Sequence, residues 1–138
     1  LVVGGVTIPF DKGLLGHSDA DVLVHSVCDA LLGAAGMGDI GTHFPDSSSE
    51  FKDIRSIRLL VRVRHVIIEK GYDIQNVDCT SFAEAPKFFK YRLPMEQNLA
   101  RAMEIDAERV NIKATTTEGL GIFGRGEGIG AMSIALIE

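Results

Sequence analysis

The sequence has few of the features that mark secreted, membrane-spanning or nucleic-acid-binding proteins. Its 138 residues include two cysteines, Cys28 and Cys79, and no tryptophan. Two cysteines provide neither a disulfide framework nor a cysteine-based metal site, and they suggest a reducing compartment in which both thiols lie in the core. The longest run of apolar residues and glycines, residues 30–38, is too short to cross a bilayer. We therefore expect no membrane partner.

Positive charge is scarce as well. The chain has 14 lysines and arginines against 19 aspartates and glutamates, which gives a net charge of −5. Non-specific nucleic-acid binding relies on basic surfaces, so we expect no nucleic-acid partner. Residues 1–5 carry no methionine and no signal-peptide pattern, and they look like the middle of a strand. We expect a single domain over residues 1–138 that lacks an N-terminal strand segment.

Hydrophobic periodicity predicts alternating strands and helices. A short strand pair or meander is expected at residues 2–3 and 6–8, on either side of Gly4 and Gly5, and longer strands at 77–83, 110–115 and 129–137. Helices are expected at 18–33, 53–70 and 94–103. This order predicts an α/β (α+β) fold in which a mixed four-stranded sheet carries helices on one face. The last strand is apolar on both faces, so we expect it to be buried on both sides.

His25 is the first candidate for chemistry. Asp21 and Asp29 lie four residues to either side of it, and a helix would place all three on one face, with Ser18 as the N-cap. A metal-bound histidine commonly gives its second N–H to a carboxylate, so this spacing suits a metal ligand. An ordinary histidine on a helix face would show the same spacing, and the residues alone leave both interpretations open.

Two further segments have the chemistry of phosphate sites. His17 and Ser18 precede a predicted helix, whose N-terminus favours anions, although a simple helix cap would look the same. The hydroxyls and amides of residues 115–117 follow a strand and could hold phosphate oxygens, while Glu118 could bind Mg²⁺. A strand end closed by a glutamate is the alternative.

Two loops complete the candidates. Lys87, Phe88 and Phe89 could hold a base and a phosphate, or could anchor a loop. Residues 119–130 contain six of the fifteen glycines but no P-loop pattern, and the Arg125 and Glu127 within them could pair with each other or face a ligand. No nucleophilic triad is evident. The residues alone favour a phosphate-binding or metal-binding α/β domain.

Several segments in register resemble the 2-C-methyl-D-erythritol 2,4-cyclodiphosphate synthase family. They are GHSDADVLVH (16–25), DALLGAAGMGDIG (29–41), FPDS (44–47), APK (85–87) and KATTTEGLGIFGRGEGI (113–129). The resemblance runs from Leu1 to Glu138. It implies a ferredoxin- or chorismate-mutase-like fold whose sheets pack against one another in a homotrimer, with each active site between neighbouring subunits.

The resemblance also implies a reaction. The family converts 4-diphosphocytidyl-2-C-methyl-D-erythritol 2-phosphate to the 2,4-cyclodiphosphate with release of CMP, a step of non-mevalonate isoprenoid biosynthesis. The 2-phosphate of the substrate attacks its own diphosphate, so no protein nucleophile is needed, and the enzyme's task is to orient the substrate and stabilise charge. The implied location is a bacterial cytoplasm, or a plastid for a plant or algal protein.

Residue roles follow from the matched motifs. His17 and Thr116 would stabilise the transition state, Glu118 would bind Mg²⁺ or Mn²⁺, and His25 would bind Zn²⁺. The two other zinc ligands of the family, an Asp-x-His, are absent here, so the zinc site is incomplete in this chain. Arg125 and Glu127 would face an axial cavity that takes isoprenoid diphosphates. The implied substrate contacts are His17, Ser18, Asp39, Ile40, Gly41, Phe44, Pro45, Asp46, Ser47, Ser48, Ala83, Glu84, Ala85, Pro86, Lys87, Phe88, Phe89, Thr115, Thr116, Thr117, Glu118, Ile122 and Arg125.

Some positions depart from the family pattern. Ser47 and Ser48 replace a usual Thr-Asp, and residues 88–91 replace a usual Met-x-Pro-His. With the missing Asp-x-His, this leaves an alternative: a non-catalytic trimer that binds cytidine nucleotides or isoprenoid diphosphates. A third interpretation is a different phosphate-handling enzyme with the same trimeric fold.

Overall fold

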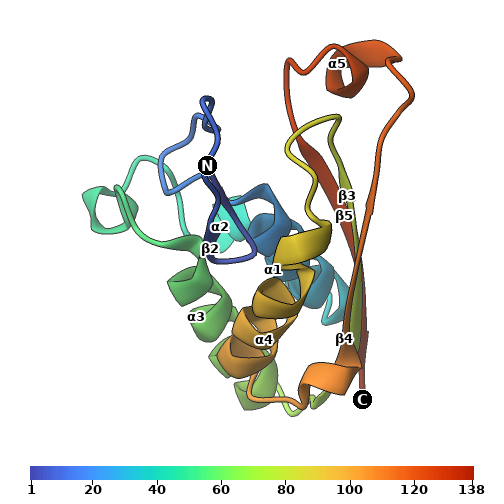
Figure 1. Cartoon of the computed structure of the whole chain (residues 1–138). Helices are drawn as coiled ribbons and strands as arrows, with labels where there is room; N and C mark the ends of the chain where they lie inside the picture. The colour runs from blue at the N-terminus through green and yellow to red at the C-terminus, as the bar shows by residue number, and fades with distance from the viewer.

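The computed structural model describes all 138 residues, and its main helices cover one side of a small sheet (Figure 1). The strands are β1 (Val2–Val3), β2 (Val6–Thr7), β3 (Ile74–Phe82), β4 (Val110–Thr115) and β5 (Gly130–Ile137). The helices are α1 (Val22–Ala34), α2 (Ile40–His43), α3 (Ser56–Glu69), α4 (Arg92–Met103) and α5 (Gly121–Gly124), with 3-10 turns η1 (Ser49–Phe51), η2 (Phe89–Tyr91) and η3 (Ala107–Arg109).

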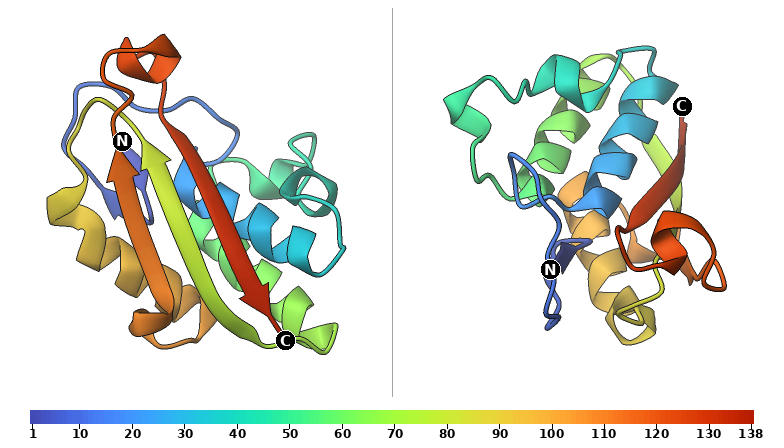
Figure 2. Two further views of the ribbon diagram at one scale, coloured as in Figure 1. Left: turned by 90° about the vertical axis from the view of Figure 1, so that its right-hand side faces the viewer. Right: turned by 90° about the horizontal axis from the view of Figure 1, so that it is seen from above.

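The main sheet has the order β4-β3-β5, with β4 parallel and β5 antiparallel to the central strand. The left view of Figure 2 shows the sheet face on, with the helices behind it. The expectations of a mixed sheet and of helices on one face are confirmed. The strand count is wrong, because the sheet has three strands and not four.

Residues 2–8 form a strand pair around Gly4 and Gly5, as the sequence predicts, but this pair is a separate two-stranded sheet and not the fourth strand of the main one. Gly4 and Gly5 have φ values of +58° and +71°, a backbone that glycine adopts without strain and that closes a tight hairpin. Val2 therefore pairs with Thr7 across the turn, and the resulting β1–β2 ribbon lies on α1 and α4 and does not join the sheet. Because the chain turns back at Gly4 and Gly5, residues 2–8 do not contribute a strand to the main sheet.

The core lies between the helices and the sheet. It contains the inward side chains of α1, α3 and α4 together with Val77 and Cys79 of β3. Cys28 and Cys79 are free and buried, as expected, and burial raises the pKa of both thiols, that of Cys79 to about 11. No helix has the length and apolar character needed to cross a membrane.

The face of the sheet turned away from the helices is open in the isolated chain. Met132, Ile134 and Leu136 of β5 are 63%, 69% and 59% exposed on this face. The expectation that the last strand is buried on both sides is therefore wrong for one chain by itself. An apolar stripe of this kind on an open face is typical of a surface that contacts another protein.

Candidate active site

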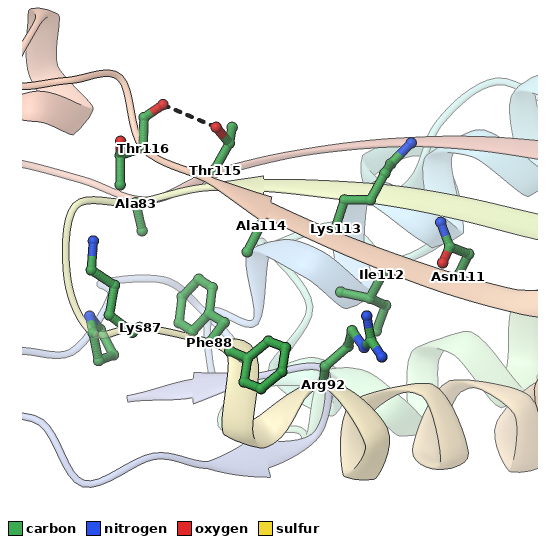
Figure 3. A pocket seen from close by; sticks show the side chains of 12 residues that line it. Ala83, Lys87, Phe88, Arg92, Asn111, Ile112, Lys113, Ala114, Thr115 and Thr116 are labelled. Carbon is green, nitrogen blue, oxygen red and sulfur yellow. Dashed lines mark hydrogen bonds between the residues drawn. The ribbon is translucent and has the colours of Figure 1, made fainter.

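Two loops that carry predicted site residues meet at one edge of the sheet. Because β3 and β4 run parallel, their carboxyl ends lie side by side, and the Ala83 amide donates to the Thr115 carbonyl at 3.1 Å. The loop after each strand therefore lines one cavity of about 420 Å³, which Figure 3 shows. Its lining residues are Ala83, Pro86, Lys87, Phe88, Phe89, Arg92, Asn111, Ile112, Lys113, Ala114, Thr115 and Thr116. We call it the strand-end cavity.

The strand-end cavity has the chemistry of an anion site beside an apolar surface. Lys87, Arg92 and Lys113 contribute three cations, and no carboxylate is among the lining residues. The ring of Phe88 is buried, while that of Phe89 is 83% exposed. Cations bind phosphate oxygens strongly, and aromatic rings offer a flat face to a base. The cavity therefore suits a phosphorylated molecule with a planar group.

Sequence reasoning missed some of these lining residues. Arg92, Asn111 and Lys113 were not predicted as site residues, because nothing in their spacing marks them. β4 is an edge strand of the sheet, so side chains along it can contact a cavity beside the edge. Lys113 also forms an ion pair with Asp78, and Asn111 donates a hydrogen bond to the same carboxylate. Both interactions lower the pKa of the Asp78 carboxyl.

A second, smaller cavity of about 130 Å³ lies where the start of α1 meets α2 and η1. Its lining includes His17, Ser18, His25, Ile40, Gly41, Phe44 and Asp46, all but His25 among the predicted substrate contacts. Apolar side chains of Phe51 in η1, of Ile54, and of Leu59 in α3 complete its lining. We call it the histidine cavity. It combines two imidazoles with an apolar wall.

His25 belongs to a hydrogen-bond network that the sequence pattern did not predict. Its Nε2 lies 2.9 Å from the Ser56 hydroxyl and 3.2 Å from the Ser18 hydroxyl. Ser56 donates its own proton to the Asp19 carboxylate. The Ser56 oxygen therefore accepts from Nε2–H of His25, and this tautomer leaves a lone pair on Nδ1.

The expectation that two carboxylates flank His25 is wrong. Asp21 is fully buried and accepts from the backbone amides of Gly4, Gly5 and Val24. Asp29 accepts from the Ile40 amide at 2.8 Å. Each side chain accepts from amides outside α1, those of Gly4 and Gly5 for Asp21 and that of Ile40 for Asp29, so helical spacing could not reveal their direction. Asp21, and not Ser18, is the N-cap of α1.

The residues fit the two expected metals differently. Nowhere in the 138 residues do three or more His, Cys, Asp or Glu side chains come together as a metal site. A structural zinc ion takes four such ligands and a catalytic one three, so His25 and its neighbours do not complete a zinc site. Glu118 is exposed next to the strand-end cavity and accepts from the Thr116 hydroxyl at 2.9 Å. One carboxylate together with ligand phosphates suits Mg²⁺.

Other predicted residues take supporting places. Asp39 caps α2, and the Thr42 hydroxyl and amide hydrogen-bonded to it lower the pKa of its carboxyl. Glu84 does not line the strand-end cavity, and its carboxylate accepts instead from two amides of the loop after β4. The predicted contacts that line neither cavity are Asp39, Pro45, Ser47, Ser48, Glu84, Ala85, Thr117, Glu118, Ile122 and Arg125.

Arg125 and Glu127 form a two-point ion pair, with N–O distances of 2.7 and 3.0 Å. The guanidinium lowers the pKa of the Glu127 carboxyl. The sequence allowed these two residues either to pair with each other or to face a ligand, and in this structure they pair with each other. Glu127 also lines a third cavity of about 180 Å³ with Glu84 and the loop at residues 10–14. Ile122, on the projecting α5, is 55% exposed.

The strand-end and histidine cavities are separate in one chain. They share no lining residue. In the left view of Figure 2, η2 and residues 39–52 lie on opposite sides of the molecule. His17 and Thr116, the two predicted transition-state stabilisers, thus belong to different cavities.

Comparisons with known proteins cover the whole chain. Residues 1–138 match the YgbB family. A 2-C-methyl-D-erythritol 2,4-cyclodiphosphate synthase from Desulfatibacillum aliphaticivorans is 59% identical over all of this chain and 89% of its own length. The enzyme of the same name from Bacillus pumilus is 56% identical over all of this chain and 87% of its own length.

Solved structures agree with these relatives. The bifunctional IspDF of Campylobacter jejuni superposes with a TM-score of 0.95 at 42% identity over 99% of this chain, which spans 37% of that longer protein. IspF of Plasmodium falciparum, in a complex with CDP, has a TM-score of 0.87 at 36% identity over 99% of this chain and 82% of its own. The chain therefore belongs to the YgbB family, the family of the 2-C-methyl-D-erythritol 2,4-cyclodiphosphate synthases.

Proposed function

We propose that this chain is a 2-C-methyl-D-erythritol 2,4-cyclodiphosphate synthase. It converts 4-diphosphocytidyl-2-C-methyl-D-erythritol 2-phosphate to the cyclic diphosphate and releases CMP. An oxygen of the 2-phosphate forms a bond to the β-phosphorus, and the bond from that phosphorus to the oxygen shared with the α-phosphate breaks, so CMP leaves with that oxygen. The observation that carries the proposal is the cationic, carboxylate-free cavity at the ends of β3 and β4, in a chain of this family.

The strand-end cavity is our proposed site for the cytidine diphosphate part of the substrate. Lys87 and the hydroxyls of Thr115 and Thr116 would hold phosphate oxygens, while Phe88 and Phe89 would contact the base. The related Plasmodium falciparum structure is a CDP complex, which supports a nucleotide ligand here as well. The neutral hydroxyls fix orientation, and the lysine supplies charge stabilisation.

The histidine cavity is our proposed site for the methylerythritol phosphate. His17 and Ser18 would bind its phosphate, and the wall formed by Ile40, Gly41 and Phe44 would contact its methyl-bearing carbon chain. Both substrate phosphates are anionic and repel one another. Bringing them together is therefore the main barrier that the protein must lower, and cations and donors on each side do this.

A site that uses both cavities requires more than one copy of the chain, because the two cavities share no lining residue within one copy. We propose a homotrimer in which neighbouring subunits contribute one cavity each. The exposed apolar stripe of Met132, Ile134 and Leu136 on β5 supports this assembly, since a trimer could bury it around the axis. In the trimer, Arg125 and Glu127 would face an axial cavity, and an isoprenoid diphosphate there would compete with Glu127 for the guanidinium.

The family uses a divalent metal ion. A bound Mg²⁺ or Mn²⁺ would supply charge neutralisation at the diphosphate. Glu118 is the residue that we propose to hold it, with the Thr116 hydroxyl orienting the carboxylate. For Zn²⁺, His25 offers Nδ1, and the other ligands would have to be groups that this chain does not bring together. The curated relatives cited above are bacterial, which favours a bacterial cytoplasm and gives no support to a plastid.

The direct test is release of CMP from the substrate in the presence of Mg²⁺ and Zn²⁺, with the cyclic product identified by mass. CMP together with the cyclic diphosphate supports the proposal. Binding of cytidine nucleotides without CMP release would favour the alternative, a non-catalytic nucleotide-binding trimer.

A subunit-mixing experiment tests the shared site. His17→Ala disables the histidine cavity and Lys87→Ala disables the strand-end cavity, and each variant by itself should be inactive. After refolding at equal amounts, about one quarter of the shared sites would combine two intact cavities and regain activity. The control mixes Lys87→Ala with Thr116→Ala, which lie in the same cavity and should restore nothing. No recovery in the first mixture would refute a shared site.

A further inference from the structure

Glu84 stands between the two loops of the strand-end cavity without lining it. It follows β3, and its half-buried side chain crosses to the loop that follows β4. There a single carboxylate oxygen, Oε1, accepts from the backbone amides of Thr117 and Gly119, each at 3.1 Å. Both donors are thereby occupied by protein, so they are not available to a phosphate of the substrate.

The loop that Glu84 holds has an unusual backbone. Glu118 has a φ of +53° and Gly119 a φ of +79°. A side chain other than glycine rarely adopts this left-handed region, so the surrounding contacts must maintain it. Within the loop, the Thr117 hydroxyl donates to the Leu120 carbonyl at 2.6 Å. Glu84 is the contact that reaches this turn from the neighbouring strand.

The turn carries two groups that the proposed reaction needs. The Thr116 hydroxyl donates to Oε1 of Glu118 at 2.9 Å, so the orientation of each depends on the backbone between them. The amides that Glu84 binds lie immediately on both sides of Glu118. A loss of these two bonds would free the turn and, with it, the direction of the Glu118 carboxylate.

We propose that Glu84 is a positioning residue that fixes the Thr116–Glu118 turn for catalysis and does not itself contact the substrate. This inference rests on the proposed function. It replaces the expectation that Glu84 belongs to the substrate contacts. Because one oxygen accepts both bonds, the function of Glu84 requires an acceptor at that distance from the backbone and not a negative charge.

Three substitutions separate geometry from charge. Glu84→Gln keeps an acceptor oxygen at the same reach and should keep kcat within about 3-fold of the wild type. Glu84→Ala removes the acceptor, and Glu84→Asp shortens the side chain by one methylene. Both should lower kcat by about 100-fold, the effect of a small displacement of catalytic groups, with KM changed much less. Glu69→Ala, an exposed glutamate at the end of α3, is the matched control and should behave as wild type.

Amide hydrogen exchange provides a readout that does not depend on activity. In Glu84→Ala, the amides of Thr117 and Gly119 should exchange at least about 10-fold faster than in the wild type, while Glu84→Gln keeps them protected. Circular dichroism of each variant shows whether it is folded. If Glu84→Ala does not fold, the turnover and amide exchange of Glu84→Asp replace it in the comparison.

The outcomes are distinct. Slow turnover and fast exchange in the alanine and aspartate variants, with rescue by glutamine, support the inference. Wild-type turnover in Glu84→Ala, or a glutamine variant as slow as alanine, overturns it, the second outcome indicating a role for the charge. A wild-type chain that releases no CMP refutes the proposed function. Wild-type amide exchange at Thr117 and Gly119 in Glu84→Ala and Glu84→Asp refutes the positioning role, whatever the activity.

Discussion

Asp21 is the buried carboxylate that joins the β1–β2 hairpin to the start of α1, and its replacement should destabilise the fold measurably. Its Oδ1 accepts from the Gly4 amide at 2.9 Å and the Val24 amide at 3.1 Å, and its Oδ2 accepts from the Gly5 amide at 2.6 Å. The side chain is fully buried. Three backbone donors from two separate segments therefore depend on one side chain.

The expected magnitude follows from these bonds. Asp21→Asn can keep the two bonds at Oδ1, but its amide nitrogen then faces the Gly5 N–H, and both groups are donors. A lost hydrogen bond to a charged group is worth about 1.5–3 kcal/mol, partly offset because a charge is no longer buried. We expect a loss of about 1–3 kcal/mol in the free energy of unfolding. Asp21→Ala removes every acceptor and should lose about 3–5 kcal/mol.

The assay is urea unfolding, with the change read from the midpoint at constant slope. Asp39→Ala, which removes an exposed helix cap, is the control and should lose clearly less than Asp21→Ala. A loss from Asp21→Asn below about 0.5 kcal/mol, or a larger loss from the control, would refute the reasoning.

The pH dependence has a definite sign. Burial raises the pKa of Asp21 above its ordinary value of 3.8, against the opposing effect of its backbone donors. The folded wild type therefore holds this proton more tightly than the unfolded chain. The resulting stabilisation is complete below the ordinary value and is lost as pH rises through the folded pKa. Asparagine does not titrate, so the gap between wild type and Asp21→Asn should be wider near about pH 4 than near about pH 7.

Three further predictions address the site, the assembly and the thiols. Glu118→Gln should shift the Mg²⁺ titration of activity to concentrations higher by about 10-fold, and an unchanged titration would count against its metal role. Ile134→Asp should convert the proposed trimer to monomers in sedimentation velocity, because it places a charge in the apolar stripe; a persisting trimer would place the interface elsewhere. Cys28 and Cys79 should resist a thiol reagent in the native protein and react in urea, since burial raises the pKa of both. Rapid native labelling of either would contradict their place in the core.

Local patterns in the sequence were sufficient for most elements of the fold. The strand predicted at 110–115 is β4 with the same bounds, and the strand predicted at 77–83 corresponds to β3, on which Val77, Cys79 and Ser81 share a buried face. The sequence also predicted that the loops after these strands carry phosphate chemistry, and the structure brings the two loops together at one cavity. Periodicity and turn residues act over a few residues, so they can be read without knowledge of the rest of the chain.

Tertiary structure decided the features that depend on distant partners. Asp21 turns to amides 16 and 17 positions away, and Glu84 turns to amides 33 and 35 positions away. No helical or strand spacing specifies such a choice, because the donor becomes available only when another segment packs beside it. The separation of the two cavities and the open apolar face of β5 are likewise properties of the packed chain. The sequence by itself thus determined most of the elements and the family resemblance, whereas only the packed structure determined which groups meet and which surfaces stay open.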